Sequence, residues 1–271
     1  MLIVDAHAHV FELCQRGVST GERLIEYMDS NSVDKAILLG NPYYGFFNDL
    51  TRKCCLDYPE RFIGVALVDV LEGEKAAWEL EALYREGILF GMAIESASTF
   101  AKAPEVRMTD RLLAPVWECI GAYKQPVFLH MFRDEDLCDL DELSGRYPDS
   151  LFICCHLGAD ACHGSAAKAQ SFDYLLDIAK RRENIMMDTS SLPDYYPQQY
   201  PFTDSCRVIE EVWKKLGAER LLWGSDYPGT LKFAPYGQLI DTVRKDCAAI
   251  PEHDLELIMG QNAQRAFWNK K

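Results

Sequence analysis

Basic residues are scarce in this sequence: 28 Lys and Arg stand against 42 Asp and Glu, which gives the 271-residue chain a formal charge of −14. A surface of this sign repels a phosphate backbone or an anionic membrane, so nucleic acid is not an expected partner. The chain also lacks an apolar run of about 18 residues and the basic start with a long apolar segment that marks a signal peptide. These absences predict a cytoplasmic protein with no membrane segment.

Several cofactor and metal motifs are missing as well. The ten cysteines form no Cys-x-x-Cys pair, which excludes a zinc ribbon. No Gly-x-Gly-x-x-Gly or Walker sequence occurs, so no nucleotide cofactor is expected. A chain of this length needs no disulfide framework, and reduced, mostly buried thiols are predicted. No linker or low-complexity tract divides the chain, which predicts one domain over residues 1–271.

Short apolar runs alternate with helical patterns along the whole chain. The apolar runs lie at residues 1–10, 33–39, 62–68, 88–94, 126–129, 151–155, 184–187 and 221–223. Helical spacing is found at 21–31, 47–58, 74–86, 110–124, 137–147, 167–182, 205–216 and 237–249. Eight strand-and-helix units predict an α/β protein, a (β/α)₈ TIM barrel, with an open doubly wound sheet as the alternative.

Residues 190–203 form the longest irregular stretch of the sequence. Three prolines forbid regular structure through most of it, and a loop of this length in a compact domain is often a functional lid. Tyr195 lies in this stretch, and Tyr43 follows the second predicted strand. Both are candidates for an aromatic, substrate-binding barrel mouth, although loop packing is an equally common role.

The first strand carries Asp5, His7 and His9 at alternate positions. Alternate residues of a strand share one face, which would set the two histidines about 7 Å apart along the strand, with Asp5 one step deeper. Two imidazoles at that spacing can share a metal ion. The alternative for an isolated His-x-His is a strand with two half-exposed histidines.

Further metal-ligand residues stand at the ends of other predicted strands. The fifth, sixth and eighth strands end in His130, His156 and Asp226, so four of the six histidines lie at strand ends. The carboxyl ends of barrel strands meet on one face, so these side chains are predicted to form a metal site there. His163 is expected in an exposed loop and His253 at a helix start, in a structural role.

These motifs, in this order, resemble the amidohydrolase superfamily, in particular the metal-dependent branch that includes aminocarboxymuconate semialdehyde decarboxylase. The resemblance covers the whole chain and is carried by Val4-Asp-Ala-His-Ala-His9, Leu129-His130, Cys155-His-Leu-Gly158, Trp223-Gly-Ser-Asp-Tyr-Pro228 and Ile258-Met-Gly-Gln-Asn-Ala-Gln-Arg265. It implies a TIM barrel in which one divalent metal is bound by His7, His9, His130 and Asp226, with His156 beside the bound water. Family members are often homodimers.

The same resemblance bears on the number and kind of metal ions. Ala93 stands where a bridging lysine would be sought, which favours a single ion, although Glu95 is close enough in sequence to supply a second. Three imidazoles and a carboxylate suit zinc, and manganese, iron or cobalt would also be accepted. Asp5 is expected either to fix a histidine tautomer or to be a buried carboxylate bonded to backbone amides.

The function favoured by these residues is a metal-dependent hydrolase that cleaves an ester, lactone or amide of a small molecule. His156 or the free oxygen of Asp226 would take the proton from water. The alternative is a non-oxidative decarboxylase of a small aromatic or unsaturated acid, and a third class is a non-catalytic binding barrel. Arg133 could bind a substrate carboxylate or belong to a surface ion-pair cluster. The scarcity of other cations after the strands favours hydrolysis.

Overall fold

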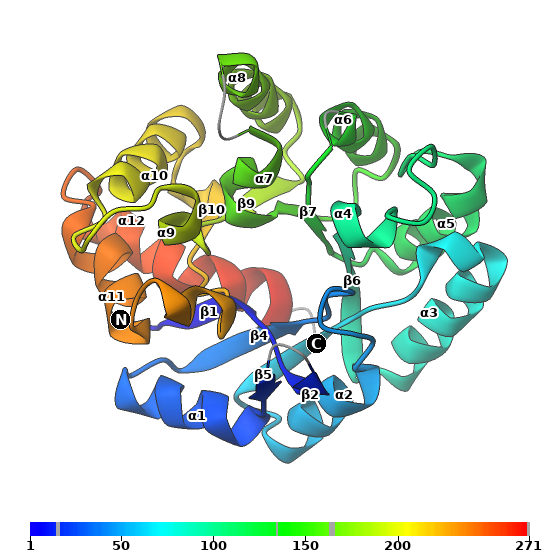
Figure 1. Cartoon of the computed structure of the whole chain (residues 1–271), viewed down its shortest axis with the longest axis horizontal. Helices are drawn as coiled ribbons and strands as arrows, with labels where there is room; N and C mark the ends of the chain where they lie inside the picture. The colour runs from blue at the N-terminus through cyan, green and yellow to red at the C-terminus, as the bar shows by residue number, and fades with distance from the viewer. Residues whose placement is uncertain (15–16, 134, 163–165, 270–271) are drawn as a thin grey trace.

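The computed structural model of this chain describes residues 1–14, 17–133, 135–162 and 166–269. Eight parallel strands form one sheet, and their spatial order follows the chain, as Figure 1 shows. The strands are β1 (Val4–Ala8), β4 (Lys35–Leu39), β5 (Phe62–Ala66), β6 (Leu89–Glu95), β7 (Val127–His130), β8 (Phe152–Cys154), β9 (Ile185–Asp188) and β10 (Leu221–Leu222). A doubly wound sheet would reverse its strand order, so the predicted TIM barrel is confirmed and the alternative is wrong.

The barrel closes between β10 and β1. The Ala6 amide donates to the Trp223 carbonyl at 2.9 Å, and the Asp226 amide donates to the His7 carbonyl at 2.8 Å. The His9 amide donates to the Tyr227 carbonyl at 2.7 Å. These bonds extend beyond the two-residue strand β10 and join the segment after it to β1. The site motif near the start of the chain and the site motif after β10 therefore lie side by side.

Helices surround the strands (Figure 1). The main ones are α1 (Gly21–Ser30), α2 (Asn48–Asp57), α3 (Glu74–Glu86), α5 (Ala114–Tyr123), α6 (Asp136–Arg146), α8 (Ala166–Arg181), α10 (Thr203–Leu216), α11 (Tyr236–Asp241) and α12 (Glu252–Glu256). Wide helical turns continue the last two at Thr242–Asp246, Leu257–Gln261 and Gln264–Trp268. The helical spacing in the sequence predicted the first eight because each buries an apolar stripe against the barrel.

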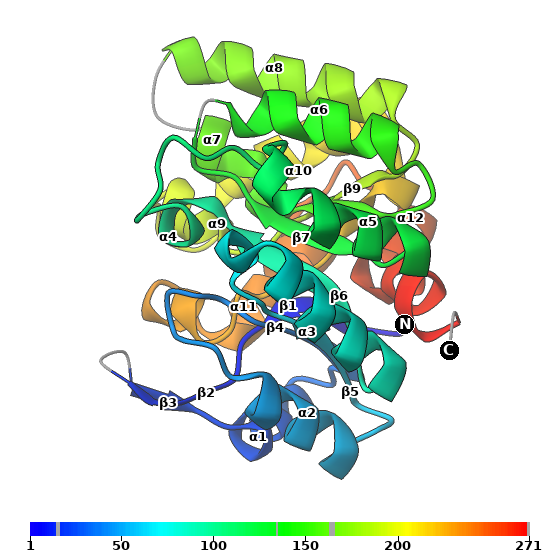
Figure 2. The same cartoon turned by 90° about the vertical axis from the view of Figure 1, so that its right-hand side faces the viewer.

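The two ends of the barrel are built differently. Figure 2 shows three short helices, α4 (Ser96–Thr99), α7 (Ala159–Cys162) and α9 (Leu192–Tyr195), on the side opposite the N-terminus and the last helical turn. Each of these short helices follows a strand, so they mark the carboxyl ends of the strands. This end is the barrel mouth, where TIM barrels carry their functional groups.

A small hairpin at the mouth was not predicted from the sequence. Strands β2 (Phe11–Cys14) and β3 (Gly17–Ser19) pair antiparallel directly after β1 and project from the barrel in Figure 2. Phe11 of the hairpin is buried and stacks on Tyr44 with ring centroids 4.3 Å apart. The hairpin therefore forms one wall of the mouth.

Apolar side chains from all eight strands fill the barrel interior. They are Val4, Ala6, Ile37, Leu39, Ile63, Val65, Ala93, Phe128, Ile153, Met186 and Leu222, joined at the closed end by Ala263 and Phe267. Inside the barrel, this packing leaves room for polar side chains only at the mouth. No helix in the described ranges is both long and apolar enough to cross a membrane.

Candidate metal centre

A bulge in β1 determines which way its histidines point. Between Asp5 and Ala8 the strand carries one residue more than its partner β4, since Asp5 pairs with Ala36 and Ala8 with Leu38. An extra residue reverses the inward and outward alternation. Val4 and Ala6 face the barrel interior before the bulge, and His7 and His9 face the mouth after it.

The bulge corrects the prediction that Asp5 shares a face with the histidines. Asp5 lies between two interior residues and so points to the opposite side, where its carboxylate accepts the Tyr236 hydroxyl at 2.7 Å. It also accepts the backbone amides of His7 at 3.1 Å and Ser225 at 2.9 Å. The alternative, a buried carboxylate bonded to backbone amides, is the observed one, and burial raises the pKa of Asp5.

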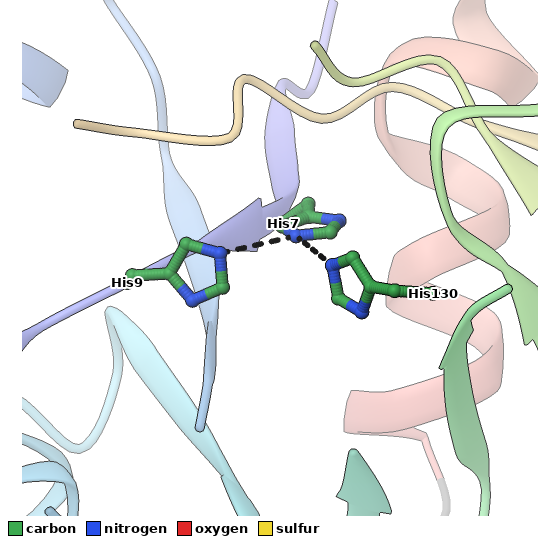
Figure 3. Close-up of side chains that lie close together, drawn as sticks. All are labelled: His7, His9 and His130. Carbon is green, nitrogen blue, oxygen red and sulfur yellow. Dashed lines mark hydrogen bonds between the residues drawn. The ribbon is translucent and has the colours of Figure 1, made fainter. Parts of the chain in front are cut away.

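Three imidazoles converge at the mouth (Figure 3). Nε2 of His7 lies 3.2 Å from Nε2 of His9 and 3.2 Å from Nε2 of His130, and all three rings are buried. The half-exposed alternative for His7 and His9 is therefore wrong. Two nitrogens bound to one tetrahedral zinc are about 3.3 Å apart, so the spacing fits a shared ion.

Asp226 joins the cluster from the segment after β10. Its Oδ1 lies 3.1 Å from Nε2 of His9 and 3.7 Å from Nε2 of His7. The residue has a left-handed backbone with φ of 55°, a conformation that costs energy for any residue but glycine and that recurs at functional sites. Burial raises the pKa of Asp226, but the surrounding histidine rings outweigh it, so the pKa lies below its ordinary value and the carboxylate is ionised.

The partners of the other ring nitrogens fix the tautomers of two histidines. Nδ1 of His7 lies 2.9 Å from Oδ2 of Asp188, and Nδ1 of His9 lies 2.9 Å from the Leu39 carbonyl oxygen. An ionised carboxylate and a carbonyl can only accept, so both Nδ1 atoms carry the proton. In the neutral form of both rings, the two Nε2 atoms then present lone pairs to each other at 3.2 Å.

Facing lone pairs repel unless a cation or a proton stands between them. Asp226 adds a further acceptor at 3.1 Å from His9. Burial and the neighbouring imidazoles push the pKa of His130 well below its usual value, so a second proton on that ring is disfavoured. A buried cluster of imidazole and carboxylate acceptors with this geometry fits a divalent metal ion.

Asp188, at the end of β9, is a site residue that sequence reasoning missed. Its side chain is fully buried and accepts from the His7 ring, the His156 amide at 3.0 Å and the Ser190 hydroxyl. Burial raises the pKa of Asp188, but the hydrogen bonds that it accepts from His7 and Ser190 help to outweigh this, so the pKa lies below its ordinary value and the group is ionised. The sequence did contain a signal for Asp188, because the seventh strand ends in a residue type that can bind a metal, as four other strands do.

His156 stands beside the three converging histidines. Its ring stacks on His7 with centroids 4.9 Å apart, and its Nδ1 lies 3.2 Å from the Ser190 carbonyl and 2.8 Å from the Ser190 hydroxyl. The carbonyl requires a proton on Nδ1, which leaves the lone pair on Nε2. His156 and Leu157 both have left-handed backbones, with φ of 57° and 54°, so the backbone of the turn after β8 that carries the His156 ring is strained.

Other predicted residues lie at different distances from the cluster. The Arg133 guanidinium is bonded to Asp136 at 3.0 Å and to the Val106 carbonyl at 2.8 Å, and it stacks over Phe100. Arg133 therefore takes part in an ion pair, the second of its two predicted roles, but its side chain is half-buried rather than on the surface. Glu95 caps α4 through the Ser98 amide at 2.7 Å. Two groups among the described residues could hold a metal ion, His7 with His9 and His130, and His7 with His156 and Asp188, and Glu95 belongs to neither.

The two aromatic candidates are both at the mouth. The Tyr195 ring lies 5.7 Å from that of His156, whereas Tyr43 is half exposed and contacts Tyr44. Tyr44, the next residue of the same loop, has its ring 5.3 Å from that of His9. The tyrosine next to the histidines on the second strand's loop is thus Tyr44, and a substrate-binding role for these rings stays a prediction.

The remaining histidines lie apart from this centre or outside the description. His253 is 78% exposed and pairs with Asp254 at 3.1 Å at the start of α12. His163 falls outside the described residues. Seven of the nine described cysteines are buried and all nine are free, as expected.

A cavity of about 690 Å³ opens beside the metal centre. Its wall includes Phe11, Tyr44 and Tyr227, and its rim carries Arg23 and Lys232. No pattern in the sequence places these two cations together, because Arg23 lies on α1 and Lys232 follows β10.

The match to a protein family covers this whole arrangement. The family model described as Amidohydrolase matches residues 4–267, and the chain therefore belongs to the amidohydrolase family. The resemblance drawn from the sequence motifs is confirmed. A comparison with curated proteins found no match.

Solved structures show the same barrel at low sequence identity. A probable 2-pyrone-4,6-dicarboxylic acid hydrolase from Acinetobacter baumannii, with citric acid bound, has 18% identity, covers 99% of this chain and 100% of its own, and gives a TM-score of 0.80. An amidohydrolase from Burkholderia multivorans with bound zinc has 16% identity, 99% coverage of both chains and a TM-score of 0.81. A dihydroxybenzoic acid decarboxylase from Polaromonas, with manganese and 2-nitroresorcinol bound, has 19% identity, covers 100% of this chain and 98% of its own, and gives a TM-score of 0.72.

Proposed function

We propose that this chain is a metal-dependent hydrolase that cleaves an ester, lactone or amide bond of a small molecule at the mouth of the barrel. The proposal rests on the arrangement of three buried imidazoles. Nε2 of His7 lies 3.2 Å from Nε2 of His9 and 3.2 Å from Nε2 of His130, and the His7 and His9 rings carry their protons on Nδ1, on the far side of the ring. In this proposal His7, His9, His130 and Asp226 bind one divalent ion, with zinc favoured and manganese, iron or cobalt accepted.

A divalent ion in this position would make water nucleophilic at neutral pH and polarise the carbonyl to be attacked. The protein's own contribution is proton transfer and orientation. His156 has its Nδ1 proton on the Ser190 carbonyl, so its Nε2 can accept the proton of the attacking water and return it to the leaving group. The other candidate base is Oδ2 of Asp226, the carboxylate oxygen that does not contact His9; it accepts from the Thr230 hydroxyl at 3.3 Å.

Decarboxylation of a small aromatic or unsaturated acid is the second candidate function. Arg23 and Lys232 on the cavity rim favour it, since they supply cationic groups that are scarce after the predicted strands. A hydrolase and a decarboxylase of similar fold both exist among the solved structures. Arg133 is a weaker substrate ligand in either reaction, because Asp136 and Val106 already bind it.

Metal analysis tests the site. Purified wild-type protein is expected to hold close to one divalent ion per chain, and His9→Ala and Asp226→Ala should lose it. His253→Ala removes an exposed histidine outside the cluster and should keep full metal content. Equal metal content in all four proteins, or none in any, would contradict the proposal and favour a non-catalytic barrel.

Substrate screening separates the two reactions. Lactones, esters, amides and aromatic acids are incubated with the metal-loaded protein while acid release and carbon dioxide are followed. Acid release from a lactone, ester or amide supports hydrolysis, whereas carbon dioxide from an aromatic acid without any hydrolysis would reverse the ranking. His156→Gln should abolish turnover and retain the metal, because it removes the proton acceptor and no ligand.

A further inference from the structure

The cavity at the barrel mouth touches the metal centre through the residues around Gly229. A Cβ placed on Gly229 would lie 3.2 Å from Oδ2 of Asp226 and 3.3 Å from the Tyr44 hydroxyl. Gly229 and Tyr44 both line the cavity, and Asp226 belongs to the metal centre. The chamber and the metal centre are therefore neighbours that share one wall.

The inner wall of this chamber is aromatic. The rings accessible in this wall are Tyr27 and Tyr44, which are partly exposed, and Tyr43, which is 50% exposed. Phe11 and Tyr227 are buried against Tyr44 and Tyr27 and support them. Flat rings with little side-chain freedom suit a flat, conjugated ligand, since stacking adds to the free energy of apolar burial. A chamber of about 690 Å³ has room for a ligand of small-molecule size.

The rim of the chamber is cationic, in a protein of net charge −14. Arg23, in the first turn of α1, uses its backbone amide to bond the Thr20 cap, and within the described ranges its guanidinium makes no ion pair. Lys232 faces Asp194 at 3.7 Å, so its charge is partly neutralised. The guanidinium of Arg23 is accordingly the principal positive group available to a ligand.

Arg23 lines the chamber together with the aromatic wall. It lies on α1, and Tyr27 of the same helix also lines the chamber, with its ring 5.3 Å from that of Tyr227. A group bound against the aromatic rings is therefore within reach of the long Arg23 side chain.

We propose that this chamber binds a carboxylate of a flat, unsaturated substrate, with Arg23 as the residue that selects for that negative charge. The reacting bond would lie at the histidine cluster, so the inference rests on the proposed function and specifies its substrate class. Arg23 recognises charge at a distance from the reacting atoms and is a specificity residue, not a catalytic one.

Binding of simple aromatic acids tests this inference without requiring turnover. Titration calorimetry on the zinc-loaded protein compares benzoate with isophthalate and terephthalate, which carry a second carboxylate at different positions. One of the dicarboxylates should bind wild-type protein about tenfold more tightly than benzoate, the gain that one charge-assisted hydrogen-bonded pair provides. Arg23→Gln should remove this gain and leave benzoate affinity unchanged, and Arg23→Lys should restore part of it.

A matched control is Arg207→Gln, which removes an exposed arginine paired with Asp204 on α10. This variant should keep the wild-type preference. An unchanged dicarboxylate preference in Arg23→Gln, or no preference in wild type, overturns the inference.

Metal content distinguishes this failure from failure of the proposed function. If Arg23 plays no part, the metal is still lost in His9→Ala while the anion preference does not change in Arg23→Gln. If the metal centre is misassigned, His9→Ala retains the metal while the Arg23 effect persists, and it persists as well in protein treated with EDTA.

Discussion

Asp188 and His7 are 181 positions apart in the sequence, yet Oδ2 of one lies 2.9 Å from Nδ1 of the other in a fully buried pair. The carboxylate holds the His7 proton on Nδ1 and turns the Nε2 lone pair toward His9 and His130. Asp188 thus sets the tautomer on which the proposed metal site depends, the task that the sequence had assigned as one option to Asp5.

Replacing this carboxylate should weaken the metal site without unfolding the barrel. Asp188→Asn keeps the shape but removes the charge that orients the imidazole, and partners of this kind typically contribute about 10- to 100-fold in metal affinity. Competition with a chelator measures the change. Asp173→Asn, at an exposed aspartate, serves as the control, and equal affinity in both variants would show that Asp188 does not set the tautomer.

Gly224 should tolerate no side chain, because it packs directly on the metal-binding strand. A Cβ there would lie 2.8 Å from Cβ of His7 and 3.2 Å from its backbone nitrogen. Gly224→Ala should lower the free energy of unfolding by about 1–3 kcal/mol through overpacking and reduce metal content by displacing His7. Denaturant unfolding and metal analysis check both effects.

Gly237→Ala is the matched glycine control. The added Cβ meets only the side-chain oxygen of Asn31, at 2.8 Å, and that group can move. The position lies in α11, where alanine is a better helix former than glycine by about 1 kcal/mol. Stability equal to or above wild type is expected, and losses of similar size in both variants would count against a special role for Gly224.

Asp160 should make the protein less stable as the pH rises from about 4 to about 7. Burial raises its pKa from 3.8 to about 7 in the folded protein. Between these values the folded state holds a proton that the unfolded state has released, so raising the pH favours unfolding by up to about 1.4 kcal/mol per pH unit. Below the lower value both states are protonated, and the effect disappears.

The variant Asp160→Asn isolates this contribution. Relative to wild type it should gain stability across that pH range and show no gain below pH 4, as measured by urea unfolding at several pH values. Asp173→Asn, whose side chain is 73% exposed, should show no such pH-dependent difference. A constant difference between Asp160→Asn and wild type at all pH values would contradict the predicted shift.

Ser205 should be replaceable by alanine with a gain in stability. Its hydroxyl is completely buried in α10 and bonds to no group in the described ranges. Removing an unsatisfied buried hydroxyl relieves about 1 kcal/mol, which thermal or urea unfolding can detect. Ser144→Ala should behave in the opposite way, because that buried hydroxyl donates to the Asp141 carbonyl at 3.3 Å.

The sequence predicted most of the barrel and part of its site for local reasons. Apolar runs of strand length and stripes of helical spacing are set by neighbouring residues, so all eight barrel strands were located within a few positions. His7, His9, His130 and His156 were placed at the mouth because strand ends on one face of a barrel must meet there. The hairpin after β1 was missed because its strands are only four and three residues long.

What the sequence by itself determined is the set of chemical groups available at the mouth and the end of the barrel where they gather, since both follow from strand periodicity and chain order. Only the tertiary structure decided how those groups are oriented. The extra residue in β1 turned Asp5 away from the histidines, and β9 brought Asp188 to His7 in its place. Arg23 lies at the chamber because α1 packs against the segment after β10 through Tyr27 and Tyr227, a contact that no local pattern encodes.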